Sequence, residues 1–278
     1  AGVLPGADDR GEAGPLREVT GLQVSLFDVS ADGRRVALSW PDQRAEVWDA
    51  ETLARLSAGP VGEDGNPMFL RLSRDGRRLL RNHGSELRVH DSGTGRWLWR
   101  GKPALEPAGW YYAHGDFAAE GGQVLGVHMA GVPRGQVALW PLTGPSGGPA
   151  KPPPPLQERP AWSVPAVTES AGVLVTGSSS RALVWTRSGL LNCYSLANGK
   201  RLLEPVEHGG AVVSVVEAGA GGWVAAAADR TVHFWDLAMK TPAPQVHLPG
   251  TVANGGRFGP DLGWFAACGN AEVALFNT

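Results

Sequence analysis

The sequence predicts an all-β protein in which about six repeated units, each of four short strands, are arranged as blades around a common axis. Three observations predict it. Glycine and proline occupy 39 and 22 of the 278 positions, above their usual shares of about 7% and 5%, and such frequent breakers exclude long helices. A turn rich in Asp, Gly and Ser followed by two apolar strands recurs along the chain. Eleven Trp outnumber Phe and Tyr together, which indicates a recurrent structural position for the indole ring.

The repeat has a measurable period. In each unit the third strand closes on an aromatic residue or His, at positions 48, 90, 140, 194, 235 and 276. The shortest spacings are 41 and 42 residues, and the two longest intervals contain insertions at 130–135 and 144–160. The second insertion is Pro-rich, and we expect its Lys151–Pro155 run to form polyproline II on the surface. A period near 41 residues with four short strands is typical of propeller blades.

Two motifs carry a family resemblance. Trp48-Asp49 and Trp235-Asp236 close third strands, and Ser-x-Asp-Gly-Arg turns begin at Ser30 and Ser73. Over residues 20–278 the chain resembles WD40-repeat β-propellers, and the other units keep degenerate closures. The resemblance implies a blade-stiffening network of His208, Asp229 and Trp235, although Ala226 stands where the family has Ser. It also implies a protein-interaction role.

The expected units are about 20–60, 61–101, 102–160, 161–204, 205–249 and 250–278, in one domain. The last unit ends at Thr278 after its third strand, while Leu16–Val19 precedes the first unit. In closed propellers of this family an N-terminal strand commonly completes the last blade, so we expect a strand within 1–19 to do so and to remove an exposed edge. Six blades are predicted; a seven-bladed ring is the alternative.

Composition and motifs argue against several functions. The 25 Lys+Arg and 27 Asp+Glu nearly balance, which disfavours nucleic acid or a membrane surface as partner, and no apolar run approaches the roughly 18 residues of a membrane span. Two cysteines cannot build a disulfide framework. No nucleophile elbow, phosphate loop or metal-binding His spacing is present. We therefore predict a non-catalytic protein without cofactor or metal.

One segment supports an alternative. Residues His90–Trp99 are similar to the Asp-x-x-Thr-Gly-x-x-x-Trp hairpin of quinone-dependent propeller dehydrogenases, which repeat that hairpin in many blades. It occurs once here. The alternatives are accordingly a quinone-type enzyme, or a propeller that binds a small ligand in its central channel.

The predicted site is the face formed by the second-to-third strand turns. Five of the six turns carry an Arg, and forked guanidinium groups suit an acidic or phosphorylated protein or peptide. The simpler interpretation is solvation of tight turns in a chain with 21 Arg and four Lys. With Trp40 as an aromatic anchor, the candidate binding residues are Trp40, Asp42, Arg44, Arg81, Asn82, His83, Arg134, Arg187, Asp229 and Arg230.

The expected location is cytoplasmic, because no secretory signal is visible. The chain starts at Ala1 rather than Met, which permits a removed leader or a longer parent protein. Bacterial propellers of this kind often follow a kinase or protease domain, so one module of a larger, bacterial-like chain is a further alternative.

Overall fold

The computed structural model describes residues 26–40, 44–58, 69–83, 86–102, 111–118, 121–129, 136–142, 160–165, 170–176, 180–208, 210–218, 223–228, 231–236, 242–247, 255–258, 264–268 and 273–277. These residues form antiparallel sheets in which strands that follow one another in sequence are also neighbours in space. Within them no helix is long and apolar enough to cross a membrane.

Five of the sheets have four strands and one has three. The first contains β1 (Leu26–Val29), β2 (Arg35–Ser39), β3 (Ala45–Asp49) and β4 (Arg55–Ala58), and the second β5 (Leu70–Leu72), β6 (Arg78–His83), β7 (Glu86–Asp91) and β8 (Trp97–Gly101). The third contains β9 (Tyr111–Ala118), β10 (Gln123–Met129), β11 (Gln136–Pro141) and β12 (Trp162–Pro165), and the fourth β13 (Ser170–Val175), β14 (Arg181–Thr186), β15 (Leu190–Ser195) and β16 (Val206–Glu207). The fifth contains β17 (Val212–Ala218), β18 (Trp223–Ala228), β19 (Thr231–Asp236) and β20 (Pro242–His247), and the sixth β21 (Gly255–Phe258), β22 (Trp264–Cys268) and β23 (Val273–Asn277).

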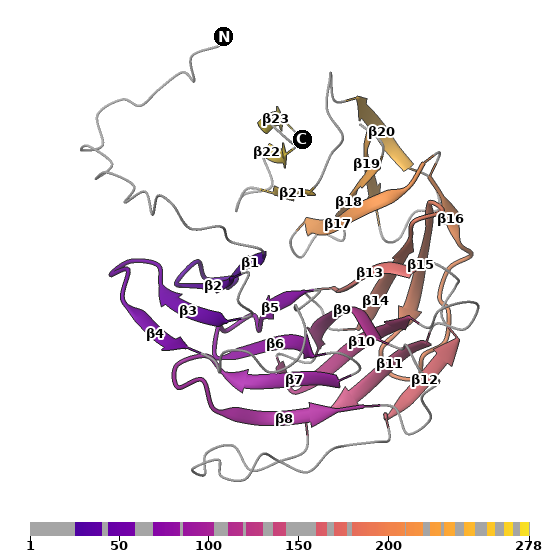
Figure 1. The fold of residues 1–278 in the computed structure, drawn as a ribbon. Helices are drawn as coiled ribbons and strands as arrows, with labels where there is room; N and C mark the ends of the chain where they lie inside the picture. Colours follow the sequence, from indigo (N-terminus) through magenta and orange to yellow (C-terminus); the bar gives the residue numbers. More distant parts are fainter. Residues whose placement is uncertain are drawn as a thin grey trace, which may run out of the picture.

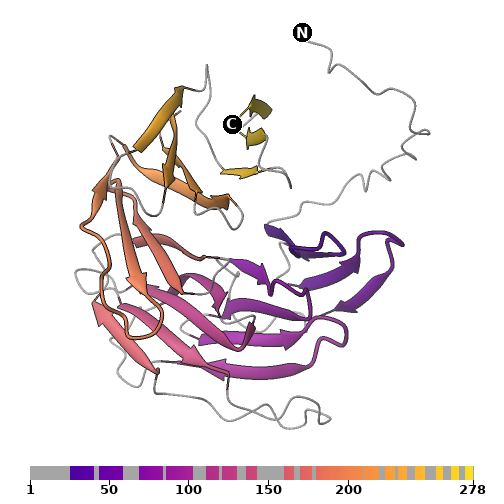
Figure 2. The same ribbon diagram turned by 180° about the vertical axis from the view of Figure 1, so that it is seen from behind.

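The sheets follow one another around a common centre, as Figures 1 and 2 show from opposite sides. The first strand of each sheet lies innermost, and β4, β8, β12, β16 and β20 lie on the outside. The predicted all-β architecture of four-stranded antiparallel units is therefore confirmed. The N-terminal strand expected within 1–19 lies outside the described residues, so its pairing and the number of blades in a closed ring stay predictions.

Two sheets extend past the expected unit boundaries. The fourth strand of the third sheet, β12, begins at Trp162, beyond the boundary expected at residue 160. The fourth strand of the fourth sheet, β16, begins at Val206, beyond residue 204. The Pro-rich segment 144–160 thus separates the third and fourth strands of one sheet, not two successive blades, and most of it lies outside the described residues.

Apolar side chains fill the spaces between successive sheets. Between the second and third sheets Leu80, Val124 and Trp140 are completely buried, and the Trp99 and Trp140 rings meet edge to face with centroids 6.0 Å apart. Each large side chain buried in this way contributes roughly 1.5–3 kcal/mol. Trp140 closes the third unit, so at this position the closing aromatic residue fills the space between two sheets.

Arginine side chains tie the turns of neighbouring sheets together. In each Ser-x-Asp-Gly-Arg-Arg turn the second Arg reaches the equivalent turn of the next sheet. Arg35 Nη1 donates to the Gly76 carbonyl oxygen at 3.0 Å and also to Ser92 Oγ, and Arg78 Nη1 donates to the Gly121 carbonyl oxygen. The 43-residue spacing of these arginines matches the blade period.

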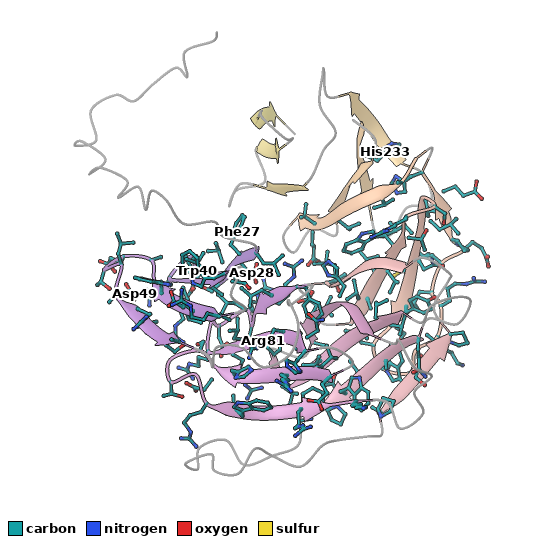
Figure 3. The ribbon with its side chains drawn as sticks, in the orientation of Figure 1. Phe27, Asp28, Trp40, Asp49, Arg81 and His233 are labelled. Atoms are coloured by element: carbon teal, nitrogen blue, oxygen red, sulfur yellow. The ribbon has the colours of Figure 1, made fainter. Side chains whose placement is uncertain are left out.

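Carboxylates on inner strands form a second kind of link. Asp28 Oδ2 of β1 accepts the Leu72 N–H of β5 at 2.7 Å, and Asp116 Oδ2 of β9 accepts the Val175 N–H of β13 at 2.8 Å. Each bond joins the backbone of one innermost strand to a side chain of the preceding sheet. Asp28 and Phe27, neighbours on β1, are labelled in Figure 3.

Candidate functional site

The second-to-third strand turns all lie at the same end of their sheets, because consecutive antiparallel strands reverse direction at each turn. The first-to-second and third-to-fourth turns lie at the opposite end. The predicted site therefore belongs to one face of the molecule. Of its ten residues, Asp42, Arg134, Asp229 and Arg230 lie outside the described residues.

Three predicted contact residues are buried. Trp40 is 7% exposed at the end of β2, so its indole ring packs inside and is not offered as an anchor. Arg81 and Asn82 are strand residues of β6, 5% and 3% exposed, where the sequence analysis placed them in a turn. The reason is that β6 and β7 remain paired as far as His83 and Glu86, which leaves only two residues for the turn. Trp40 and Arg81 are labelled in Figure 3.

Arg81 belongs to a charged cluster inside the second sheet. It lies directly opposite Arg88 on β7. Glu86 Oε2 accepts from Arg88 Nε at 3.1 Å and Glu86 Oε1 from Arg100 Nη2 at 2.6 Å. The Arg88 guanidinium also lies 4.5 Å from the ring centroid of Trp97, a cation–π contact. Arg88 and Arg100 therefore link β7 to β8 within one blade.

His90 replaces the closing Trp in this cluster. It is 3% exposed and meets Trp97 edge to face, with ring centroids 5.3 Å apart. Burial, and then the charges of Arg81 and Arg88, lower the pKa of His90 to about 3. The imidazole is accordingly neutral and structural, as expected for a residue at a closing position. A small cavity beside it, lined also by Ala45 and Arg81, has room for about one water molecule.

Arg187 is the predicted site residue that is most clearly presented to solvent. It is exposed in the turn between β14 and β15. Thr186 Oγ1 accepts the Leu190 N–H at 2.9 Å across this turn, and the Gly189 carbonyl oxygen accepts the His208 N–H at 2.8 Å. The turn is therefore fixed both internally and against the segment leading to the fifth sheet. Arg44 and His83 are partly exposed at the equivalent turns of the first two sheets.

The hairpin that resembles quinone-dependent enzymes is a turn that recurs within this chain. Asp91 Oδ1 accepts the Thr94 N–H and Oγ1–H, both at 2.8 Å. In the first sheet Asp49 Oδ1 accepts the Thr52 N–H at 2.7 Å and Oγ1–H at 2.8 Å. The same hydrogen bonds therefore close the third-to-fourth strand turn in both blades, which accounts for the Asp-x-x-Thr pattern without a cofactor.

His208 contacts a residue outside the expected network. His208 and His233 pack edge to face, with ring centroids 4.8 Å apart, and each is at most 6% exposed. Burial, and then the nearby His233, lower the pKa of His208 to about 4. His233 on β19, labelled in Figure 3, is thus a partner that the family pattern did not indicate. Asp229 lies outside the described residues, so its predicted role is untested.

Comparisons with known proteins were made by sequence and by structure. No protein-family model matches the sequence, and no curated protein matches it significantly. Among solved structures, a chain of the mitotic checkpoint complex has a TM-score of 0.72 at 13% identity, over 92% of this chain and 77% of that one. The C-terminal WD40 domain of Sif2 has a TM-score of 0.69 at 15% identity, over 94% and 68%, and the computationally designed Ika8 protein one of 0.66 at 13% identity, over 92% and 71%.

These observations define the class of the protein, which is of β-propeller type. Its four-stranded antiparallel sheets are joined by turns that carry charged side chains. The fold is that of WD40-repeat domains, as the structural likeness over more than nine-tenths of the chain shows. The resemblance drawn from the Trp-Asp closures and Ser-x-Asp-Gly-Arg turns is confirmed at the level of fold.

Proposed function

We propose that this chain is a non-catalytic interaction module that binds a protein or peptide on the face formed by the second-to-third strand turns. The observation that carries the proposal is Arg187, an exposed guanidinium group on a turn fixed from both sides by hydrogen bonds. A guanidinium group carried by such a fixed turn can recognise carboxylates and phosphates through paired hydrogen bonds. We therefore expect an acidic or phosphorylated segment in the partner, and we place the module in the cytoplasm.

WD40-type folds are widely used as scaffolds, which supports the proposal. One structurally similar chain belongs to the mitotic checkpoint complex, an assembly of proteins. The burial of Arg81 and Asn82 moves the expected contact surface away from the second sheet. Arg187 and Arg44 are the described arginines of the predicted set that reach solvent, and Arg230 is the corresponding residue of the fifth unit.

The test is affinity purification with mass spectrometry, using a variant in which Arg44, Arg187 and Arg230 are changed to Glu. The variant is expected to lose the recovered partner and to keep its melting temperature. A control variant in which Lys200 and Arg201, which are exposed elsewhere, are changed to Glu also reverses positive charges and should retain the partner. Because Arg44 is partly buried, the single Arg187→Glu variant is measured as well. Unchanged recovery by folded triple and single variants would refute the proposed face.

A quinone-type enzyme remains the competing proposal, and it makes a different prediction. Addition of pyrroloquinoline quinone with calcium should then produce a bound-cofactor absorbance spectrum and dye-linked turnover. We expect neither, because the hairpin that suggested the enzyme is duplicated by the Asp49–Thr52 turn.

A further inference from the structure

The two Ser-x-Asp-Gly-Arg-Arg turns bring together five arginines that the proposed function does not use. They lie between β1 and β2 (residues 30–35) and between β5 and β6 (residues 73–78). These twelve residues carry five Arg and two Asp, a formal charge of +3, in a chain whose net charge is −2. Because they are first-to-second strand turns, they lie on the face opposite to the proposed docking face.

Both turns have the same internal structure. Asp32 Oδ1 accepts the Ser30 Oγ–H at 2.6 Å and the Arg34 N–H at 3.0 Å, and Asp75 Oδ1 accepts the Ser73 Oγ–H and the Arg77 N–H at the same distances. The two carboxylates are therefore engaged in shaping their own turns. The first Arg after each glycine, Arg34 or Arg77, is exposed to solvent.

The two turns are also fixed relative to each other. Arg35 Nη1 donates to the carbonyl oxygen of Gly76 at 3.0 Å, and Gly76 immediately precedes Arg77. The backbone carbonyls of Arg34 and Arg77 accept the N–H groups of Ala50 and Ser92, each at 2.9 Å. One exposed guanidinium from each of two adjacent blades is thus carried by a single hydrogen-bonded unit, which limits the conformational entropy lost when a ligand binds both.

The surroundings restrict where an anionic ligand can lie. The third-to-fourth strand turn of the first sheet runs beside Arg34 and carries Asp49 and Glu51. These two acidic residues border the basic turns on the outer side. They repel a partner's acidic groups, which are attracted instead toward the basic turns themselves. The third sheet has Gly121-Gly122-Gln123 at the equivalent position. The surface is therefore limited to the first two blades.

We propose that the turns 30–35 and 73–78 form a second docking surface, which binds a short acidic segment of a protein through the guanidinium groups of Arg34 and Arg77. The shared chemistry is a pair of oxyanions, supplied by glutamate or aspartate carboxylates or by phosphorylated side chains. The surface is distinct from the Arg187 face, so a partner could be held on both faces at once.

The test measures fluorescence anisotropy of three labelled ten-residue peptides: one rich in Glu, one with phosphoserines at the same positions and one with Gln there. The whole chain should bind an acidic peptide in low salt and the Gln peptide at least tenfold more weakly. The Arg34→Gln, Arg77→Gln double variant is expected to lose about tenfold or more in affinity, since two charge-assisted contacts are removed. The Glu and phosphoserine peptides identify which oxyanion is preferred.

The control is a Lys200→Gln, Arg201→Gln double variant, which removes two exposed positive charges elsewhere and should bind within twofold of the unaltered chain. The single Arg187→Gln variant is measured separately: loss of binding in that variant, with none in the Arg34→Gln, Arg77→Gln variant, would overturn the second surface while leaving the proposed Arg187 face intact. Equal binding by both double variants, or no binding of either acidic peptide, would also overturn it. A short duplex DNA that displaces the peptide and binds more tightly would show that the turns recognise nucleic acid instead.

Discussion

Asp116 makes the stability of this protein depend on pH in a way that one substitution can isolate. Its carboxylate links two innermost strands through the Val175 N–H. Burial raises the pKa of Asp116 from 3.8 to about 6, opposed by the nearby Arg71 and by the hydrogen bonds from backbone N–H groups. Between these two pH values the folded state holds a proton that the unfolded chain has released. Stability due to this group is therefore present below pH 4 and is lost as the pH rises through 6.

The size of the effect follows from the shift. About two pKa units correspond to about 3 kcal/mol, and partial exposure of the side chain reduces the expected effect to about 1–2 kcal/mol. Asp116→Asn keeps an oxygen for the Val175 N–H and removes the titration. We expect the free energy of unfolding of the variant, relative to the unaltered protein, to increase by about 1–2 kcal/mol between pH 4 and pH 7.

Urea unfolding at several pH values measures this difference. His90 and His114 produce the opposite slope, because burial lowers the pKa of each to about 3, so that stability falls as pH decreases below 6.5. Both contributions cancel when variant and parent are compared at each pH. Asp116→Ala is the control: it should remove the same pH dependence and, in addition, lower stability at every pH by the loss of the inter-sheet hydrogen bond. A difference curve that is flat or that falls with pH would refute the assignment.

Five further substitutions test the turns and the links between sheets. Leu53 has a left-handed backbone (φ 56°) where the equivalent turn of the next sheet has Gly95. Leu53→Gly should raise the midpoint of thermal unfolding slightly, and Gly95→Leu should lower stability by about 1 kcal/mol. A change of stability in the same direction for both variants would contradict backbone strain at this turn position. Arg35→Gln should cost about 1–2 kcal/mol in urea unfolding by breaking the inter-sheet link, whereas exposed Arg34→Gln should change stability by less than about 0.5 kcal/mol. Gly189→Ala should cost about 2 kcal/mol, because φ is 93° and a Cβ would lie 2.6 and 2.7 Å from two backbone oxygens; a neutral result would show that the turn can move.

The fold could be predicted from the sequence because its signals are local. The turn at Ser30–Arg35 and the apolar run before Trp48 lie within about twenty residues of each other, and both recur at the blade period. The structure explains why they recur, since Asp32 and Asp75 close their turns with identical hydrogen bonds. Local hydrogen bonds of this kind depend on residue type and spacing, and a sequence shows both.

The contact surface was less predictable because burial depends on pairing between strands. Arg81 looked like a turn residue, yet β6 and β7 pair two residues beyond it. No local pattern fixes where a hairpin ends when polar residues continue through it. The His208–His233 contact and the bond from Asp28 to Leu72 join segments about 25 and 44 residues apart, and a single sequence carries no signal for either.

The arginines show how residue type alone can mislead an argument about binding. Arg35 and Arg78 satisfy backbone carbonyls of the next sheet, and Arg88 packs between Glu86 and Trp97. Such arginines are bound within the protein, and reversing their charge would destabilise it rather than reveal a partner. Arg34, Arg77 and Arg187 instead expose their guanidinium groups on turns whose backbone is already hydrogen-bonded. A charge reversal at these positions is expected to remove recognition without removing structure, so these arginines can separate a binding defect from a folding defect.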